Sequence, residues 1–383
     1  MILKTVEITN FRNYAQEKVE LNDNINFFIG ENGQGKTNFL EMVYYLALGR
    51  SFKNIKDDEI INWHKDFFKI KGTLYKENIN RDFEIEITYE RKGKKTIKIN
   101  GVIYRKLSDL LGVLQVSTFT PEDLTIIKDG PQKRRKYMDL EISQLKKGYY
   151  NNLLDYYRVI KQRNNLLKEI NFNQENHALL EVWDNQLINL GSRIIKERME
   201  FLKILVPLSR KFQWEISKGQ EKLDITYNSV LVKNPYEGQK EIINNFKKEL
   251  KEKKQEEIKK GITLVGPHRD DLIFYINGKE LKKYGSQGQQ RSAVLSLKVA
   301  ELKLFYNDTG DYPILLLDDV MSELDDTRRN FLTNIIRKNN IQSLITGANE
   351  ELKGNSLAKE VFKVREGKIE KNKVNGFNPI RMD

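Results

Sequence analysis

The residues with the clearest chemical meaning form a phosphate-binding motif near the start of the chain. The segment GENGQGKT follows the pattern G-x-x-x-x-G-K-[ST]. In such a motif backbone N–H groups point at phosphate oxygens, the lysine reaches the β- and γ-phosphates, and the hydroxyl holds Mg²⁺. The motif therefore predicts an ATP–Mg²⁺ site built from Gly30, Glu31, Asn32, Gly33, Gln34, Gly35, Lys36 and Thr37.

Two carboxylates that could complete this site lie far along the chain. Residues 312–317 are an apolar run, and Asp318 and Asp319 follow it directly. Such a run is typical of a parallel strand buried on both faces, and open α/β sheets bind ligands at the carboxyl ends of their strands. We expect Asp318 to serve Mg²⁺, directly or through a water, and Asp319 to orient or polarise the attacking water. Taken alone, the segment could also be a strand that ends in a polar turn.

A serine–glycine segment is the third candidate. Ser286 and Gln289 have the S-x-x-Q spacing of a capping box, just before an apolar helix expected at residues 292–305. The N-terminus of a helix exposes backbone donors and binds anions. The segment is therefore either a plain helix cap or a second anion site. Because residues 30–37 already supply a phosphate loop, a second anion site would serve the ATP of another subunit.

The phosphate motif requires a strand before it and a helix after it, and the sequence predicts both. Residues 25–29 are an apolar run, and residues 38–48 have a helical pattern that ends at Gly49. After the acidic pair, Ser322 to Asp325 open a helix expected at about 326–336, for which Ser322 is a candidate N-cap. These elements predict an α/β fold.

The middle of the chain interrupts that fold. Residues 131–260 have helical apolar stripes, with helical stretches of about 40 residues that would reach about 60 Å. The sequence before this zone is β-rich, and from residue 261 onward strands and helices alternate again. We therefore predict a discontinuous domain, 1–130 together with 262–383, and an inserted helical domain, 131–261.

The composition limits the classes of protein. The 383 residues have a formal net charge of +12, which favours a polyanionic partner, although a lysine-rich codon bias is an alternative explanation. There is no cysteine, so disulfides and thiolate metal sites are excluded, and three scattered histidines do not suggest a metal site. No stretch reaches the roughly 18 apolar residues of a membrane span, and the first residues do not resemble a signal peptide. We expect a cytoplasmic protein without a membrane partner.

A hairpin and the start of the helical zone supply basic groups for a polyanion. Residues 82–89 and 96–100 alternate as the two strands of the hairpin, with residues 91–95 as its turn. The candidate DNA contacts on these two segments are Arg91, Lys92, Lys94, Lys95, Lys133, Arg134 and Arg135. A solvated loop is the alternative for each of them.

The order of these motifs resembles that of ABC-type ATPase heads, the group that includes SMC proteins. Within this group the chain is most similar to the RecF family, which acts in bacterial DNA replication and repair. The segments that carry the resemblance are NFRNY at 10–14, FTPEDL at 119–124, DGPQKRR at 129–135, GPHRDD at 266–271 and residues 315–325.

The resemblance implies an ABC/SMC-type P-loop ATPase head with a β-rich lobe and an inserted, mostly α-helical lid domain. It implies a weak, DNA-stimulated ATPase that binds single-stranded, double-stranded and junction DNA as an ATP-dependent homodimer. With RecO and RecR, such a protein would recognise gapped or junction DNA and promote RecA loading in recombinational repair, replication restart and the SOS response.

The resemblance also assigns roles to single residues. The catalytic group would be Lys36, Asp318 and Asp319, with Thr37 and Asp318 at the metal. The signature that completes the partner subunit's site would be Ser286, Gly288 and Gln289, with Asp325 at the dimer seam. Glu122 would sense the γ-phosphate. Transporter-type ATPases carry a histidine after the strand that follows the seam residue; this chain has none there, and Thr346 is its candidate γ-phosphate contact.

Other classes fit less well. A transporter subunit would have its signature closer to the phosphate loop and would need a membrane partner. A motor or signalling NTPase with hydrolysis itself as its output, including another SMC-like DNA ATPase, would turn over quickly as a monomer. A structural adaptor with a degenerate site is disfavoured because Lys36, Thr37, Asp318 and Asp319 are all intact.

Overall fold

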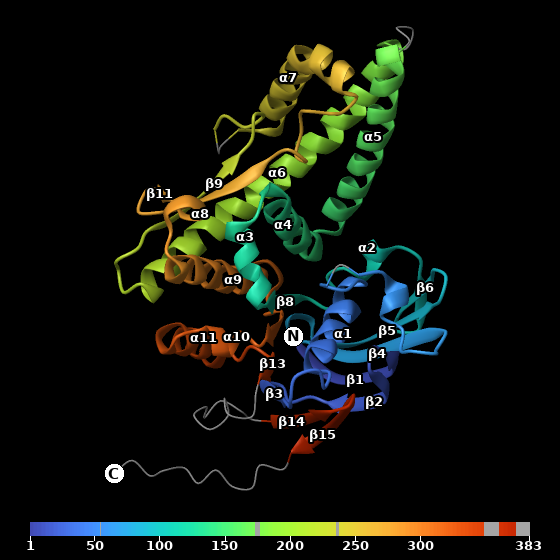
Figure 1. Ribbon diagram of the computed structural model, residues 1–383, viewed down its shortest axis with the longest axis vertical. Helices are drawn as coiled ribbons and strands as arrows, with labels where there is room; N and C mark the ends of the chain where they lie inside the picture. Colours follow the sequence, from blue (N-terminus) through green and yellow to red (C-terminus); the bar gives the residue numbers. More distant parts are fainter. Residues whose placement is uncertain (54, 173–176, 235–236, 348–359, 373–383) are drawn as a thin grey trace. The chain divides into compact units, whose positions relative to one another are not determined.

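The computed structural model describes residues 1–53, 55–172, 177–234, 237–347 and 360–372 (Figure 1). The chain divides into two compact units, Met1–Asp123 with Glu301–Asp383, and Leu124–Ala300. The second unit thus extends beyond the boundary expected near residue 261. One reason is that the strand at residues 271–276 pairs with a strand at residues 223–228, inside the helical zone. The sequence-based domain organisation itself stays a prediction.

The first unit contains two sheets with their helices. Its elements are β1 (Ile2–Phe11), β2 (Tyr14–Glu20), β3 (Ile25–Ile29), α1 (Lys36–Leu48), η1 (Asp57–Glu59), β4 (Phe67–Lys76), η2 (Glu77–Ile79), β5 (Arg81–Glu90), β6 (Lys94–Ile99), β7 (Val102–Tyr104), α2 (Leu107–Leu110), β8 (Val116–Phe119), η3 (Pro121–Leu124), β12 (Ile314–Asp318), α10 (Val320–Glu323), α11 (Asp326–Lys338), β13 (Ser343–Gly347), β14 (Glu360–Arg365) and β15 (Lys368–Asn372).

The central sheet has the strand order β15-β14-β3-β13-β12-β8, and all of its neighbours pair in parallel except β14 and β15. Every residue of β3 and of β13 is buried, as are the four apolar residues of β12. The predicted central parallel strand before Asp318 is therefore confirmed. Because β13 lies between β3 and β12, the carboxyl ends of the phosphate-loop strand and the acidic strand share one edge of the sheet.

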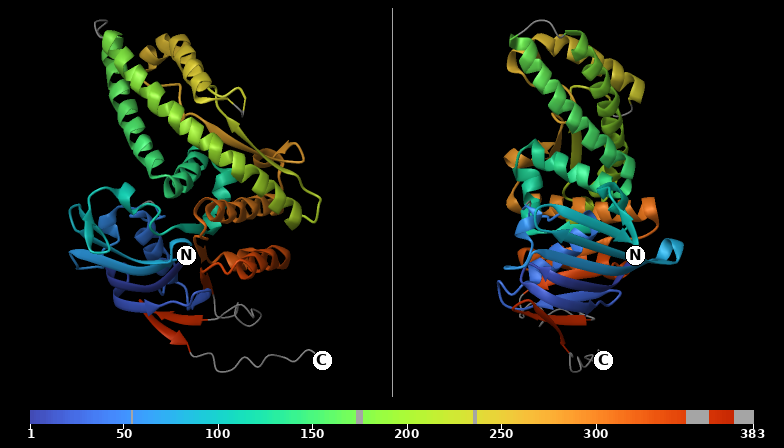
Figure 2. Two further views of the ribbon diagram at one scale, coloured as in Figure 1. Left: turned by 180° about the vertical axis from the view of Figure 1, so that it is seen from behind. Right: turned by 90° about the vertical axis from the view of Figure 1, so that its right-hand side faces the viewer.

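The second sheet is antiparallel, in the order β2-β1-β4-β5-β6-β7 (Figure 2). It contains the predicted hairpin, formed by β5 and β6. The expected turn at residues 91–95 is too long, because Glu90 pairs with Lys94 and Tyr89 with Lys95. The turn is Arg91–Lys92–Gly93, where Lys92 and Gly93 have φ of 74° and 104°. Glycine adopts this left-handed conformation without steric strain.

The second unit is mostly helical. Its elements are α3 (Thr125–Lys128), α4 (Pro131–Leu145), α5 (Lys147–Phe172), α6 (His177–Ile216), β9 (Leu223–Asn228), α7 (Gln239–Lys260), β10 (Asp271–Ile276), β11 (Lys279–Glu280), α8 (Leu281–Tyr284) and α9 (Gln287–Thr309), of which α9 continues into the first unit. Helix α6 has 40 residues, as long as the sequence suggested. Helices α5 and α6 lie side by side (Figures 1 and 2).

Buried charges hold the second unit together. Arg163 of α5 is 1% exposed, and its guanidinium donates to Asp184 (2.8 Å), to Thr263 (3.0 Å) and to Glu257 of α7 (2.6 Å). The Glu257 carboxylate also accepts from the backbone N–H of Leu264 at 2.7 Å. The ion pairs thus fix α5, α6 and α7 to the loop that precedes β10.

The GPHRDD segment at 266–271 belongs to the same interior. Arg198, fully buried on α6, donates to the carbonyl of Pro267 at 2.7 Å and to Asp139 at 2.8 Å. His268 contacts the Tyr156 hydroxyl (2.7 Å) and the Thr263 carbonyl (3.1 Å), and burial lowers its pKa to about 4. This segment, one of those that carry the family resemblance, thus stabilises the fold. Within the described residues, no helix is long and apolar enough to span a membrane.

Candidate nucleotide-binding site

The phosphate loop runs from the end of β3 to the start of α1, as the sequence predicted. Two of its glycines are fixed by their surroundings. A Cβ on Gly30 would lie 2.4 Å from the carbonyl oxygen of Val364, and a Cβ on Gly35 would lie 2.6 Å from the Asn13 side chain. Both residues also have positive φ, 156° and 120°. The loop therefore takes a shape that other residues would not adopt without strain.

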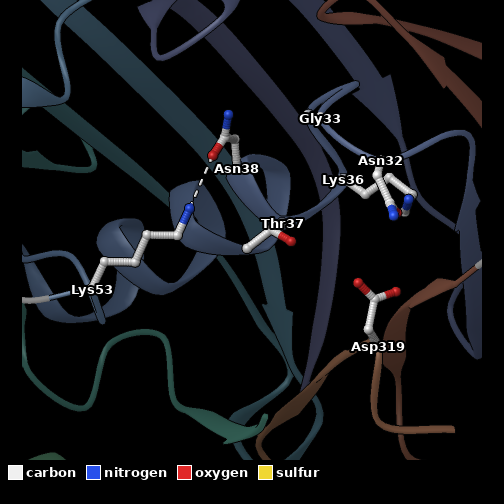
Figure 3. A pocket seen from close by; sticks show the side chains of 8 residues that line it. Asn32, Gly33, Lys36, Thr37, Asn38, Lys53 and Asp319 are labelled. Atoms are coloured by element: carbon white, nitrogen blue, oxygen red, sulfur yellow. Dashed lines mark hydrogen bonds between the residues drawn. The ribbon is translucent and has the colours of Figure 1, made fainter. Parts of the chain in front are cut away.

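Lys36 lies over the loop. Its Nζ donates to the carbonyls of Gly30 (2.8 Å) and Glu31 (3.1 Å), which leaves one ammonium N–H for a further acceptor. The loop opens onto a hollow of about 260 Å³ (Figure 3). The residues around it are Asn32, Gly33, Gly35, Lys36, Thr37, Asn38, Lys53 and Asp319. The structure thus places the phosphate motif and one carboxylate of the acidic pair around a single space.

Asp318 is held by two hydroxyl groups. The Oγ1 atoms of Thr37 and Thr346 both donate to its Oδ1 at 2.8 Å. Thr346 can do so because β12 and β13 pair with Asp318 opposite Thr346. Thr346 is fully buried and also accepts from the backbone N–H of Asp319 at 3.0 Å. Its hydroxyl positions the acidic pair; the γ-phosphate contact suggested for it stays a prediction.

Asp319 points its carboxylate into the hollow, on the side of Thr37 and Asn32 (Figure 3). Its backbone has φ of 52°, a conformation that is uncommon for residues other than glycine and that is enriched at functional sites. Burial, and then the neighbouring Asp318 carboxylate, raise the pKa of Asp319, while Lys36 lowers it. A carboxylate with a raised pKa is a better proton acceptor than an ordinary one.

The donor set suits Mg²⁺ better than a metal held by the protein alone. Among the described residues no group of three or more histidine and carboxylate side chains could hold a metal ion. The Thr37 hydroxyl and the Asp318 carboxylate, 2.8 Å apart, are instead the pair expected where phosphate oxygens and waters complete an octahedral shell. Thr37 and Asp318 would hold the ion, which would neutralise charge on the phosphates.

Three residues that contact the phosphate loop, Asn13, Glu366 and Gly367, were given no role in the site from the sequence. Gln34 accepts from the N–H groups of Glu366 (2.7 Å, at its side chain) and Gly367 (3.1 Å, at its carbonyl), both in the β14–β15 turn. The same carbonyl accepts from Asn13 Nδ2 at 2.9 Å. The NFRNY segment and the β14–β15 turn thus both hold the phosphate loop at the carbonyl of Gln34. Only the resemblance marked Asn13; no motif pointed to Gly367.

The serine–glycine segment forms the predicted capping box. The N–H of Ser286 donates to Gln289 Oε1 (3.0 Å), and the N–H of Gln289 donates to Ser286 Oγ (3.2 Å). The Ser286 side chain is exposed, and Gly288 lies in the first turn of α9. The segment belongs to the unit Leu124–Ala300, whereas the phosphate loop belongs to the other unit. The role of these residues in a partner's site stays a prediction.

The remaining predicted residues lie away from the hollow. Asp325 is the N-cap of α11 and accepts from the N–H of Arg328 at 2.9 Å. Ser322 is not that cap; its hydroxyl donates to the carbonyl of Asp319 at 2.8 Å. Glu122 is an exposed residue of the turn η3 and is not among the residues around the hollow. The seam role of Asp325 and the sensor role of Glu122 stay predictions.

The candidate DNA contacts on the hairpin differ in whether their charged groups are available to bind a phosphate. Lys95 donates to the carbonyl of Gly49 (2.7 Å) and pairs with Asp57 (2.8 Å), so its ammonium is occupied. Arg91 donates to the carbonyl of Lys65 at 2.7 Å. Lys92 and Lys94 are exposed, and Lys94 has only a 3.7 Å contact with Glu90.

The second basic group contains one residue that a phosphate cannot reach. Arg134 is buried; it binds both carboxylate oxygens of Asp271, at 2.6 and 2.9 Å, and the carbonyls of Ile126 and Asp129. We therefore remove it from the candidate DNA contacts. Arg135 donates to the carbonyl of Asp270 at 2.6 Å, and Lys133 is exposed.

Comparison with known proteins identifies the family to which the chain belongs. A family model described as the RecF/RecN/SMC N-terminal domain matches residues 2–371. The DNA replication and repair protein RecF of Oceanobacillus iheyensis is 42% identical over 372 residues, which cover 96% of this chain and 100% of the relative. RecF of Clostridium tetani is 42% identical over 375 residues, 97% of this chain and 100% of the relative. The chain belongs to the RecF family.

Solved structures agree with this assignment. A solved structure described as the recombination mediator protein RecF-ATP in the RecFOR pathway has a TM-score of 0.89 at 38% identity, and the match covers 97% of each chain. An Smc head domain from Pyrococcus furiosus, with a TM-score of 0.57 at 14% identity, covers 97% of this chain and 96% of its own and shares the fold alone. The predicted fold, an ABC/SMC-type ATPase head with an additional helical part, is confirmed for this member of the RecF family.

Proposed function

We propose that the protein is a cytoplasmic, ATP-dependent DNA-binding protein of recombinational repair and replication restart. ATP and Mg²⁺ would drive two copies into a homodimer that binds gapped or junction DNA. With RecO and RecR the dimer would promote RecA loading and SOS induction, and DNA would stimulate its slow ATP hydrolysis. Support comes from membership of the RecF family and from a solved relative described as RecF-ATP in the RecFOR pathway.

The observation that carries the proposal is the convergence of Lys36, Thr37, Asp318 and Asp319 on one edge of the central sheet. Lys36 has a free N–H for the terminal phosphates, and Thr37 with Asp318 would hold the ion that bridges them. Asp319 would take the proton of the attacking water. Thr346 would keep the two carboxylates in register with the loop.

The homodimer is proposed because the chain offers a candidate for a second anion site. Ser286, Gly288 and Gln289 stand at the N-terminus of α9, where a helix favours negative charge. In a two-fold dimer each of these segments would face the γ-phosphate bound by the other copy, and both sites would form together. Only ATP would drive the association, because ADP lacks the phosphate that both chains contact. Asp325 would lie at the seam, and Glu122 and Thr346 would respond to the γ-phosphate.

Mixing two variants tests the proposal. Ser286→Arg should leave ATP binding by the monomer nearly intact and block dimerisation and hydrolysis. Lys36→Met should abolish ATP binding, because the side chain supplies charge to the phosphates. The mixture should regain ATP-dependent dimers in light scattering, since one of its two sites keeps both native residues. Wild type that stays monomeric at micromolar concentration with ATP and DNA would contradict the homodimer, and rapid hydrolysis by that monomer would favour the motor-type alternative.

A further inference from the structure

Trp63 is the most exposed large apolar side chain of the described residues, at 84%. It lies in the loop between η1 and β4, next to the turn of the β5–β6 hairpin: the backbone N–H of Arg91 donates to the carbonyl of Asp66 (2.7 Å), and the Arg91 guanidinium donates to the carbonyl of Lys65 (2.7 Å). Water thus reaches most of an indole ring beside a basic turn. A ligand that covers the indole would remove this apolar surface from water, which is favourable.

The loop that carries Trp63 is held in place. The backbone N–H of Asn62 donates to the carbonyl of Asn10 (2.8 Å), and its side-chain amide donates to the carbonyl of Arg12 (2.7 Å). The N–H of Arg12 in turn donates to the carbonyl of Ile60 at 2.7 Å. The residues just before Trp63 are thus anchored to the NFRNY segment, and Lys65 and Asp66, just after it, are anchored to Arg91 of the hairpin turn. A ligand that covers the indole would therefore not have to order the loop first.

The charges around the indole favour an anion. Lys65 and Lys92 are exposed, and neither forms an ion pair within the described part of the chain. Two carboxylates oppose them: Asp66 lies 3.9 Å from Arg91, and Asp58 accepts from the N–H of Lys92 and the hydroxyl of Tyr89. With Arg91 and Lys94 there are four cations, and with Glu90, 3.7 Å from Lys94, there are three carboxylates, so the cations exceed the carboxylates by one. One indole among cations is also far smaller than the apolar centre of a stable protein interface.

We propose that Trp63 stacks on an unpaired DNA base whose backbone phosphates are held by Arg91, Lys92 and Lys65; this inference rests on the proposed DNA-binding function. An aromatic ring beside basic groups binds single strands by stacking, because every base has a flat apolar face. Inside a duplex those faces are covered by the neighbouring pairs. The indole therefore distinguishes DNA with unpaired bases from an uninterrupted duplex, which the phosphate contacts alone do not.

The test compares three labelled DNAs of equal length, a blunt duplex, a gapped duplex and a single strand, with ATP present. Trp63→Ala should weaken binding to the gapped and single-stranded DNA about 5- to 150-fold, the range for losing one stacked base. Binding to the blunt duplex should change less than about twofold. The salt dependence should not change, because the indole neutralises no phosphate. Trp63→Phe should retain most of the affinity.

Trp214→Ala is the matched control, since Trp214 is also exposed, at 54%, but lies in the second unit. Equal losses on all three DNAs, or none, with normal wild-type binding would overturn the stacking role and leave the proposed function standing. Weaker ATP-driven dimerisation of Trp63→Ala, measured without DNA, would place the indole at a protein interface and overturn it as well. If the wild type binds none of the three DNAs, both the inference and the proposed function fail.

Discussion

Two groups of charged side chains in this protein differ in whether they can still bind a ligand. In the first unit, Lys36 keeps a free N–H and Asp319 faces an open hollow, so both can take new partners. In the second unit, Arg163, Glu257 and Arg198 are buried, and their hydrogen-bonding groups are used by neighbouring side chains and carbonyls.

The contrast separates charged residues that act from charged residues that support. The family model matches residues 2–371 and so covers both groups, which means that family membership alone does not tell them apart. A charge that is buried and fully paired stabilises an arrangement of helices and has no capacity left for a ligand. A charge beside an open hollow keeps that capacity.

The largest effect is expected from breaking the buried group. Arg163→Met would leave Glu257 buried without its partner, which costs about 3–5 kcal/mol of unfolding free energy. Arg158→Met, an exposed pair on the same helix, should change it by less than about 1 kcal/mol. Urea unfolding measures both, and ATP affinity should not change while the protein is folded. Equal stabilities for the two variants would contradict the supporting role.

Asp319→Asn probes the open group. The variant should bind ATP normally and hydrolyse it at least about 100-fold more slowly, since a positioned base contributes that much. The wild-type rate should fall as pH drops through the pKa of Asp319, which burial and Asp318 raise above the usual 3.8, because protonation removes the base. Steady-state rates and nucleotide titrations give both quantities. A parental rate in the variant would remove Asp319 from the reaction.

His268 should make the stability of the buried interior of the second unit depend on pH. Burial holds its pKa near 4 in the folded protein, against 6.5 for the ordinary side chain, so the unfolded chain binds the proton more readily. Stability should therefore fall as pH drops from 7 to 5, by about 2 kcal/mol from this residue. Burial raises the pKa of Asp270, which acts in the opposite direction. The slope of unfolding free energy against pH should be smaller in His268→Gln; an unchanged slope would mean that His268 does not titrate in this range.

Lys92→Gln should have the smallest effect. If Lys92 neutralises one phosphate, the slope of log affinity against log salt on duplex DNA should fall by about 0.9. Lys253→Gln, on the charged outer face of α7, is the control and should leave the slope unchanged. Filter binding at several salt concentrations measures the slope. Identical slopes for the wild type and Lys92→Gln would remove Lys92 from the candidate DNA contacts.

Local patterns in the sequence were sufficient to predict several elements. The glycine loop, the apolar strand before Asp318 and the capping box at Ser286 depend on residues a few positions apart, and all three are present. Strand β9 was missed, because one short alternating segment lies among helical patterns and shows its role only when β10 pairs with it. The hairpin was right and its turn two residues too long, since cross-strand pairing sets where a turn ends.

The sequence by itself determined which residues could do chemistry; the tertiary structure decided which of them are free to do it. Arg134 looked like a DNA contact until the fold placed Asp271, 137 positions away, against its guanidinium. The contact of the Thr346 hydroxyl with Asp318 was not visible in the sequence, because it depends on the pairing of β12 with β13. Long-range partners such as these depend on how strands and helices meet, and burial then fixes whether a charge is satisfied or exposed. Trp63 is the reverse case: no motif marked it, and only the fold leaves its ring in water.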